Sequence, residues 1–271
     1  MAHASDQSSL LSDHALTDTG RGERALVFLH GFGADQSVWR LVAPRFADRH
    51  SVIAYDHMGC GRSNAHGRDA ASYGDLGGYA ADLAAILDAL DLRDVLVVAH
   101  SVAGMMALLA ARRTDRIGGI AMVGTSPCYI DQGDYVGGFS LADVEELLSM
   151  MELDFQGWAR NVADVAIADP GRPELAQELV YSFSRANPEL LRRFARATFL
   201  CDYRRDLAAC TTPVLALQAS ADALVPAEAA AYLADHIPGA RLHTLKARGH
   251  YPQLSAPDEV FQEVQTFLEA A

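Results

Sequence analysis

The chain alternates between short apolar runs and longer stretches in which apolar positions recur every three or four residues. The apolar runs cover residues 25–30, 50–56, 94–100, 117–124, 211–220 and 240–246. Most are continuously apolar rather than alternating, which is typical of strands buried on both faces of a sheet. Helical patterns such as residues 77–90 separate several of them. The pattern therefore predicts an α/β fold, with a mostly parallel sheet flanked by helices.

Four helical patterns in succession interrupt this order. They cover residues 140–151, 155–167, 172–186 and 188–200, with no strand pattern between them. No repeat or low-complexity linker sets the segment apart, so we expect one domain over residues 1–271. Its core would take about residues 22–125 and 205–271, and a helical lid would take about residues 126–204.

Composition and charge limit the expected partners and location. The net charge is −13, and no run of Lys or Arg offers a phosphate-binding stripe, which argues against nucleic acid and anionic membranes as partners. The sequence has neither a long apolar run nor the basic start and apolar run of a signal peptide. We therefore expect a cytoplasmic protein. No heptad seam or exposed apolar stripe is visible, so we expect a monomer.

Ser101 lies where a strand pattern gives way to a helical one. The stretch VLVVAHSVAGMM, residues 95–106, places it at the centre of A-H-S-V-A. This resembles the nucleophile elbow G-x-S-x-G, in which a sharp turn raises the serine oxygen above the sheet. Alanine replaces both glycines of the motif, but it adds only one methyl group. Taken alone, a serine at such a junction is more often a helix cap than a nucleophile.

Three further positions favour the nucleophile. The stretch HGFG, residues 30–33, follows a strand, where the backbone N–H groups of Phe32 and Val102 would hold an oxyanion. Asp222 follows the next strand pattern after the helices, and His250 lies in a glycine-containing loop before the last helix. The order Ser, Asp, His is the order expected for this kind of elbow.

The three residues Ser101, Asp222 and His250 predict the hydrolysis of an ester-like bond through an acyl-serine. Such a reaction needs no metal and no organic cofactor, and we expect none. His30 and His100 flank the expected site, but they lack the H-E-x-x-H spacing or another metal-ligand spacing. We assign both histidines to structural hydrogen bonds.

Five longer stretches resemble one branch of the α/β-hydrolase superfamily. They are HGFGADQSVW, YDHMGCGRS, AHSVAGMMALLAARR, SPCYIDQGDYVGGF and GHYPQLSAPDEV, which begin at residues 30, 55, 99, 126 and 249. The chain is similar to the RsbQ-type bacterial stress-response hydrolases and to the related strigolactone and karrikin receptors of plants. The fourth stretch is the most specific, because no catalytic rule requires it. The resemblance implies a four-helix lid inserted after the sixth strand.

The resemblance also implies roles for single residues. It places Ser101, Asp222 and His250 on the family's catalytic triad. It assigns an enclosed apolar pocket to Phe32, Val102, Tyr129, Phe139, Trp158, Val162, Phe199 and Tyr251. The alternative for each aromatic residue is a place in the core of the lid. Val162 stands where the plant receptors are expected to carry a larger aromatic residue, so their hormone specificity does not carry over.

Two functions follow, and a third stays open. The first is a serine carboxylic-ester hydrolase acting on a small hydrophobic ester or lactone. The second is an RsbQ-like signalling or receptor protein that binds or slowly hydrolyses a small apolar ligand and engages a regulatory partner, which the resemblance makes a phosphatase with a sensor domain. The third is a lyase or another non-hydrolytic activity, because one fold hosts many chemistries.

Overall fold

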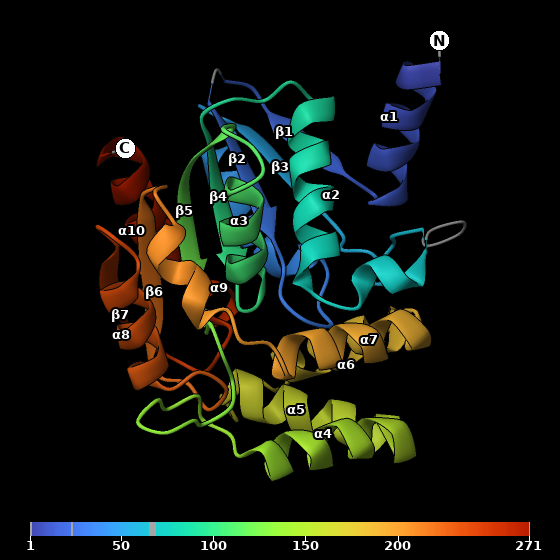
Figure 1. Cartoon of the computed structure of the whole chain (residues 1–271), viewed down its shortest axis with the longest axis vertical. Coiled ribbons are helices and arrows are strands. Elements are labelled where there is room, and N and C mark those ends of the chain that lie inside the picture. The colour runs from blue at the N-terminus through green and yellow to red at the C-terminus, as the bar shows by residue number, and fades with distance from the viewer. Residues whose placement is uncertain (1, 23, 65–68, 271) are drawn as a thin grey trace.

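The computed structural model describes residues 2–22, 24–64 and 69–270 (Figure 1). Within these residues, one seven-stranded sheet has the strand order β1-β3-β2-β4-β5-β6-β7. The strands are β1 (Thr17–Gly20), β2 (Ala25–Leu29), β3 (Ser51–Tyr55), β4 (Val95–His100), β5 (Ile117–Val123), β6 (Val214–Ala221) and β7 (Arg241–Arg248). Only the pairing of β1 with β3 is antiparallel. The predicted mostly parallel sheet is confirmed.

The central strand β4 positions the candidate nucleophile. All of its residues are buried, as expected for a continuously apolar strand between two neighbours. It runs parallel to β2 on one side and to β5 on the other, and Leu29 of β2 lies opposite Ala99. The loop after β2 and the turn after β4 therefore leave the sheet side by side.

Helices cover the sheet on both faces. In Figure 1, α2 (Leu76–Ala89) and α3 (Ala103–Ala111) lie in front of the sheet, and α1 (Ala2–Asp13) stands apart beside α2. After the lid follow α8 (Ala227–His236), α9 (Pro252–Ser255) and α10 (Pro257–Ala270). The described residues also include four short 3-10 helices, at Gln36–Trp39, Ala43–Phe46, Ala70–Tyr73 and Arg204–Ala209. Across the described ranges, every helix is too short or too polar to serve as a membrane span.

Four helices form the lid, namely α4 (Leu141–Leu153), α5 (Phe155–Ile167), α6 (Pro173–Arg185) and α7 (Pro188–Phe199). They lie across the ends toward which the parallel strands run (Figure 1). Their starts follow from local chemistry, since Ser140 and Asp143 form a capping box on α4 and Asn187 caps α7.

The expected insertion after the sixth strand is wrong, because in the described residues the lid follows the fifth strand, β5, and precedes β6. The reason lies at the start of the chain. The described residues before β2 form the helix α1 and the single short strand β1, so one strand fewer comes before the lid.

The carboxyl end of α5 is joined to the loop that follows β7. The N–H of His250 donates to the carbonyl of Ala166 over 2.6 Å. Gly249, at φ +83°, lies so close to the carbonyl oxygen of Ile167 that a Cβ would come within 2.3 Å of it. Arg172 adds a hydrogen bond of 3.0 Å to the carbonyl of Ser255. The lid is thus fastened at this end by hydrogen bonds to main-chain carbonyls.

Gly104 sets the distance between α3 and the loop after β5. A Cβ at this position would lie 2.3 Å from Oγ1 of Thr125, whose hydroxyl donates to the carbonyl of Ser101. We expect Gly104→Ala to lower the free energy of unfolding by about 1–3 kcal/mol through overpacking, measured by urea denaturation. Gly74→Ala is the control, because its nearest atom would lie at 3.4 Å. Equal midpoints for the two variants would contradict the prediction.

Candidate active site

Ser101 sits in a left-handed turn between β4 and α3. Its φ is +57°, a conformation that costs a residue with a side chain about 1–3 kcal/mol and persists only where the surroundings enforce it. Here the N–H of Ser101 donates to Val123 over 2.7 Å, and its carbonyl accepts from Thr125 over 2.9 Å. Ala99 and Ala103 are completely buried on either side of the turn. Small residues are needed there, and alanine meets that need.

Ser101, His250 and Asp222 form a continuous chain of hydrogen bonds. His250 Nε2 lies 2.9 Å from Ser101 Oγ, and His250 Nδ1 lies 2.7 Å from Asp222 Oδ2. The other carboxylate oxygen of Asp222 accepts from the N–H groups of Leu224 and Val225 over 2.9 and 3.1 Å. Because a carboxylate only accepts, Nδ1 carries the proton and Nε2 accepts the hydroxyl hydrogen of Ser101.

Two backbone N–H groups belong to segments that meet beside Ser101. Phe32 follows β2 and Val102 caps α3, and the parallel pairing of Leu29 with Ala99 makes the two segments neighbours. In the part of the chain that the structure describes, neither N–H donates a hydrogen bond. A helix N-terminus carries a partial positive charge. The arrangement is therefore suited to an oxygen that gains negative charge.

Three buried histidines support the backbone around this region. His30 Nδ1 donates to the carbonyl of Gly31 over 2.8 Å, and its Nε2 accepts from the N–H of His57 over 2.9 Å. His100 Nε2 donates to the carbonyl of His250 over 2.8 Å. Burial holds the pKa values of His57 and His100 well below the usual range, so both rings are neutral. Among the described residues, no three metal-ligating side chains come together.

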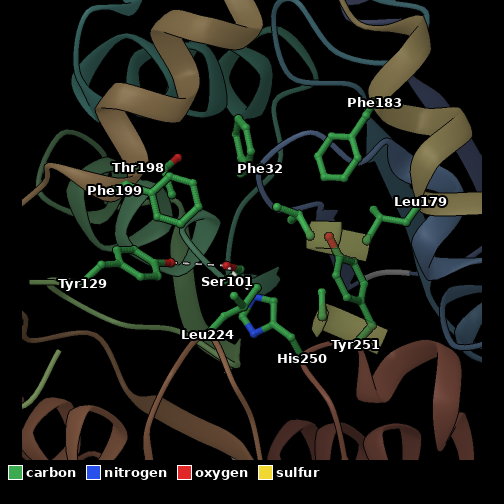
Figure 2. Close-up of a pocket in the computed structure, with 12 residues that line it drawn as sticks. Phe32, Ser101, Tyr129, Leu179, Phe183, Thr198, Phe199, Leu224, His250 and Tyr251 are labelled. Atoms are coloured by element: carbon green, nitrogen blue, oxygen red, sulfur yellow. Dashed lines mark hydrogen bonds between the residues drawn. The ribbon is translucent and has the colours of Figure 1, made fainter. Parts of the chain in front are cut away.

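A cavity lies next to Ser101 on the lid side, and Figure 2 shows side chains from the lid and from the loops after the strands around it. Its lining consists of Phe32, Ser101, Tyr129, Val162, Ala166, Leu179, Phe183, Thr198, Phe199, Leu224, His250 and Tyr251. The space open to the centre of a water molecule is about 20 Å³, enough for about one water. Of the residues predicted to bind substrate, Phe32, Tyr129, Val162, Phe199 and Tyr251 lie on this lining.

Trp158 and Phe139, also predicted to bind substrate, lie behind the lining. Trp158 is buried against Phe32 and Phe183, with ring centroids 6.1 and 5.1 Å apart. Phe139 is half-buried, and its ring lies 6.5 Å from that of Phe199. Both aromatic residues support the residues that face the cavity. A resemblance shows that a position carries an aromatic residue. It does not show whether that residue lines the cavity or packs behind the lining.

Sequence reasoning missed several lining residues, namely Ala166, Leu179, Phe183, Thr198 and Leu224. Leu179 and Phe183 are four residues apart on α6, so they share one face of an amphipathic helix. That spacing was visible in the sequence. Leu224 lies two residues after Asp222, and its proximity to the site could also have been inferred.

Tyr129 contacts the candidate nucleophile directly. Its hydroxyl lies 3.3 Å from Ser101 Oγ (Figure 2), and burial raises its pKa far above the usual value, so it stays protonated. The residues on either side of it form isolated β-bridges to Asp202 and Phe139. Because Ser101 donates its own hydrogen to His250, the Tyr129 hydroxyl donates to Ser101 Oγ. Nothing in the sequence pattern indicated this hydrogen bond.

Known proteins share both sequence and structure with this chain. A strigolactone esterase of Arabidopsis thaliana, D14, is 34% identical over 97% of this chain and 98% of its own length. The karrikin insensitive 2 receptor IA of Petunia hybrida is 33% identical, with 88% of each chain covered. The solved structure of a hydrolase from Oleispira antarctica, olei00960, superposes with a TM-score of 0.95 at 34% identity, and the match covers 98% of both chains.

These relatives confirm the resemblance to the strigolactone and karrikin receptors, and their names support a hydrolase or receptor role. The similarity to RsbQ-type proteins stays a prediction. The family model described as the alpha/beta hydrolase family matches residues 26–263. That match begins within β2, spans β3 to β7 and the lid, and includes Ser101, Asp222 and His250. The chain therefore belongs to the alpha/beta hydrolase family.

Proposed function

We propose that this chain is a serine carboxylic-ester hydrolase acting on a small hydrophobic ester or lactone. The observation that carries the proposal is the hydrogen-bonded chain from Asp222 through His250 to Ser101, at 2.7 and 2.9 Å. It ends beside two backbone N–H groups without partners in the described residues. These are the parts that acyl transfer through a serine requires.

The proposed reaction has two halves. Ser101 Oγ attacks the carbonyl carbon while His250 Nε2 takes the hydroxyl proton, and the N–H groups of Phe32 and Val102 stabilise the resulting oxyanion. His250 returns the proton to the leaving alcohol as the ester bond breaks, which leaves an acyl-serine. Water, deprotonated by His250, then attacks the acyl-serine and releases the acid. Asp222 holds the ring and stabilises its protonated form throughout.

The lining of the cavity supports an uncharged apolar substrate. Among its described residues there is no Lys, Arg, Asp or Glu, and most are aromatic or aliphatic. Helices of the lid supply part of this lining, such as Leu179 and Phe183, and we propose that the segment at about residues 126–204 forms one domain with the core. A cytoplasmic location and a monomeric state remain predictions.

The test is hydrolysis of p-nitrophenyl acetate and butyrate by the purified protein, followed by intact-mass spectrometry after mixing. We expect release of p-nitrophenolate and a transient mass increase that matches one acyl group. A peptide map should place that group on Ser101. Equal turnover of both esters by wild type and Ser101→Ala would contradict the proposal.

A receptor role is a second candidate, because one relative is named a receptor and the cavity at Ser101 has room for about one water. In this reading the same triad acts slowly on an apolar ligand, and the lid then contacts a regulatory protein of the sensor-phosphatase kind. It predicts a slow burst of one turnover with a lasting adduct on Ser101 or His250. Ligand-dependent capture of such a phosphatase would favour it, while rapid multiple turnover without capture would count against it.

Tyr129 is expected to affect the second half of the reaction. When the acyl-serine breaks down, negative charge develops on Ser101 Oγ, and the Tyr129 hydroxyl at 3.3 Å can donate to it. A hydrogen bond to a charged group contributes about 1.5–3 kcal/mol. Tyr129→Phe should therefore slow deacylation by about tenfold or more, with the burst amplitude retained.

Stopped-flow hydrolysis of p-nitrophenyl acetate separates the burst from the steady state. Tyr135→Phe is the matched control. Its hydroxyl lies in the same segment but bonds to the carbonyl of Cys128 and not to Ser101. Equal steady-state rates for the two variants would show that the Tyr129 hydroxyl does not assist the reaction.

A further inference from the structure

A second hollow opens between the four lid helices. It is lined by Met151, Glu152, Phe155, Gln156, Phe183, Ser184, Ala186, Pro188, Leu191 and Arg192. These residues come from the end of α4, the start of α5, the end of α6 and the start of α7. We call it the lid groove. Its space open to the centre of a water molecule is about 310 Å³.

Phe183 borders both the lid groove and the cavity at Ser101. Among the described residues it is the one member common to both linings. Its ring rests against Gly33, where a Cβ would come within 2.0 Å of the ring carbon Cε1. Phe32 and Trp158 contact the ring from other sides, with centroids 5.9 and 5.1 Å away. Phe183 is therefore a wall residue of both spaces, and the loop carrying Phe32 supports its ring.

The cavity at Ser101 is much smaller than the lid groove, at about 20 Å³ against about 310 Å³, and this difference limits where a substrate fits. The cavity at Ser101 has room for about one water, so an ester cannot enter until a side chain moves. The space for a longer molecule lies in the lid groove.

The walls of the lid groove differ between its inside and its rim. Met151 and Leu191 are buried and Phe155 is half-buried, whereas Glu152 and Arg192 are exposed. The groove is thus apolar within and polar where it meets water. A linear hydrocarbon chain suits such walls, because its burial is favourable and it needs no hydrogen-bond partner.

We propose that the lid groove is a second subsite of the same substrate site, that it takes the linear apolar chain of an ester, and that Phe183 is the partition the chain must pass. This inference rests on the proposed function and adds the substrate class, an ester with a chain of medium length. Displacement of the Phe183 ring joins the two spaces.

The experiment compares Phe183→Ala with Leu179→Ala. Both residues lie on α6 and line the cavity at Ser101, but only Phe183 borders the lid groove. The probes are linear alkylboronic acids from ethyl to decyl, measured as inhibitors of p-nitrophenyl acetate hydrolysis. The boron accepts Ser101 Oγ, a B–O bond forms and the hydroxyl proton passes to His250, so one alkyl chain reports the available space.

In Phe183→Ala we expect the inhibition constant to keep falling with chain length, by up to about fourfold per methylene. In Leu179→Ala the gain should end after one or two methylenes, because the enlarged cavity remains closed. Leu191→Trp in the Phe183→Ala background should cancel the gain by filling the lid groove. Phe183→Leu is measured as well, in case Phe183→Ala unfolds.

Identical chain-length profiles in the Phe183 and Leu179 variants would overturn the second subsite. The proposed function would still stand in that case, as long as acetate hydrolysis depends on Ser101. Absence of Ser101-dependent acetate hydrolysis would overturn both, because acetate has no chain that needs the lid groove.

Discussion

Replacing Ser101 by alanine is expected to lower the rate of ester hydrolysis by about 10⁶-fold, the loss seen when a serine nucleophile is removed. The physical reason is that Oγ forms the bond to the acyl group, and among the described side chains Ser101 Oγ is the hydroxyl that lies 2.9 Å from His250 Nε2. Tyr129 reaches the same place, but burial keeps its pKa far above the working pH. The measurement is turnover of p-nitrophenyl acetate by wild type and variant at equal concentration.

The fold of this variant should survive, since alanine keeps the Cβ that the turn at φ +57° already accommodates. Circular dichroism and thermal melting check this directly. Ser182→Ala is the control. Ser182 is a buried serine on the lid, and its hydroxyl donates to Asp35 and not to Ser101, His250 or Asp222. Residual activity of Ser101→Ala above one per cent would mean that another group performs the attack.

Asp222→Asn should lower the rate by about 10⁴-fold. One carboxylate oxygen accepts from the N–H groups of Leu224 and Val225, so the side-chain carbonyl of asparagine would keep that place. The amide NH₂ would then face His250 Nδ1, which can only accept from it. The ring proton would move to Nε2 and point at Ser101, and His250 could no longer take the hydroxyl proton.

Steady-state kinetics of Asp222→Asn test this reasoning, together with the exposed control Asp235→Asn on α8. We expect the control to match wild type. A nitrogen NMR spectrum of the histidine rings should show the proton of His250 moved from Nδ1 to Nε2. A variant with nearly full activity would show that Asp222 does not orient the histidine.

The strands and the triad Ser101, Asp222 and His250 could be predicted from the sequence, because both depend on apolar runs and on the residues that directly follow them. A continuously apolar run ends at Ser101, another ends close to Asp222, and His250 follows the last strand. Parallel strands bring their carboxyl ends to one edge of the sheet, so side chains at those ends meet there. The one wrong element, the strand count before the lid, concerns β1 and α1, which no strong apolar run marked.

The inner surface of the lid could be predicted only in part. An amphipathic pattern shows which face of a helix is apolar, but not which of the apolar residues meet the cavity and which meet another helix. Trp158 fell into the second group and Phe183 into both the cavity and the lid groove. The distance from Tyr129 to Ser101 likewise depends on how two distant segments pack, which no pattern within one segment records.

The bond between the N–H of His250 and the carbonyl of Ala166 has a consequence for engineering. Every residue type at position 166 has the same main-chain carbonyl. Substitutions along α5 therefore leave this hydrogen bond intact as long as the helix ends at the same residue. Exchange of whole segments is different. A chimaera that takes only α6 and α7 from a relative keeps the native hydrogen bond between Ala166 and His250. A chimaera that also takes α5 needs a helix of the same number of residues, so that a carbonyl again lies opposite the N–H of His250.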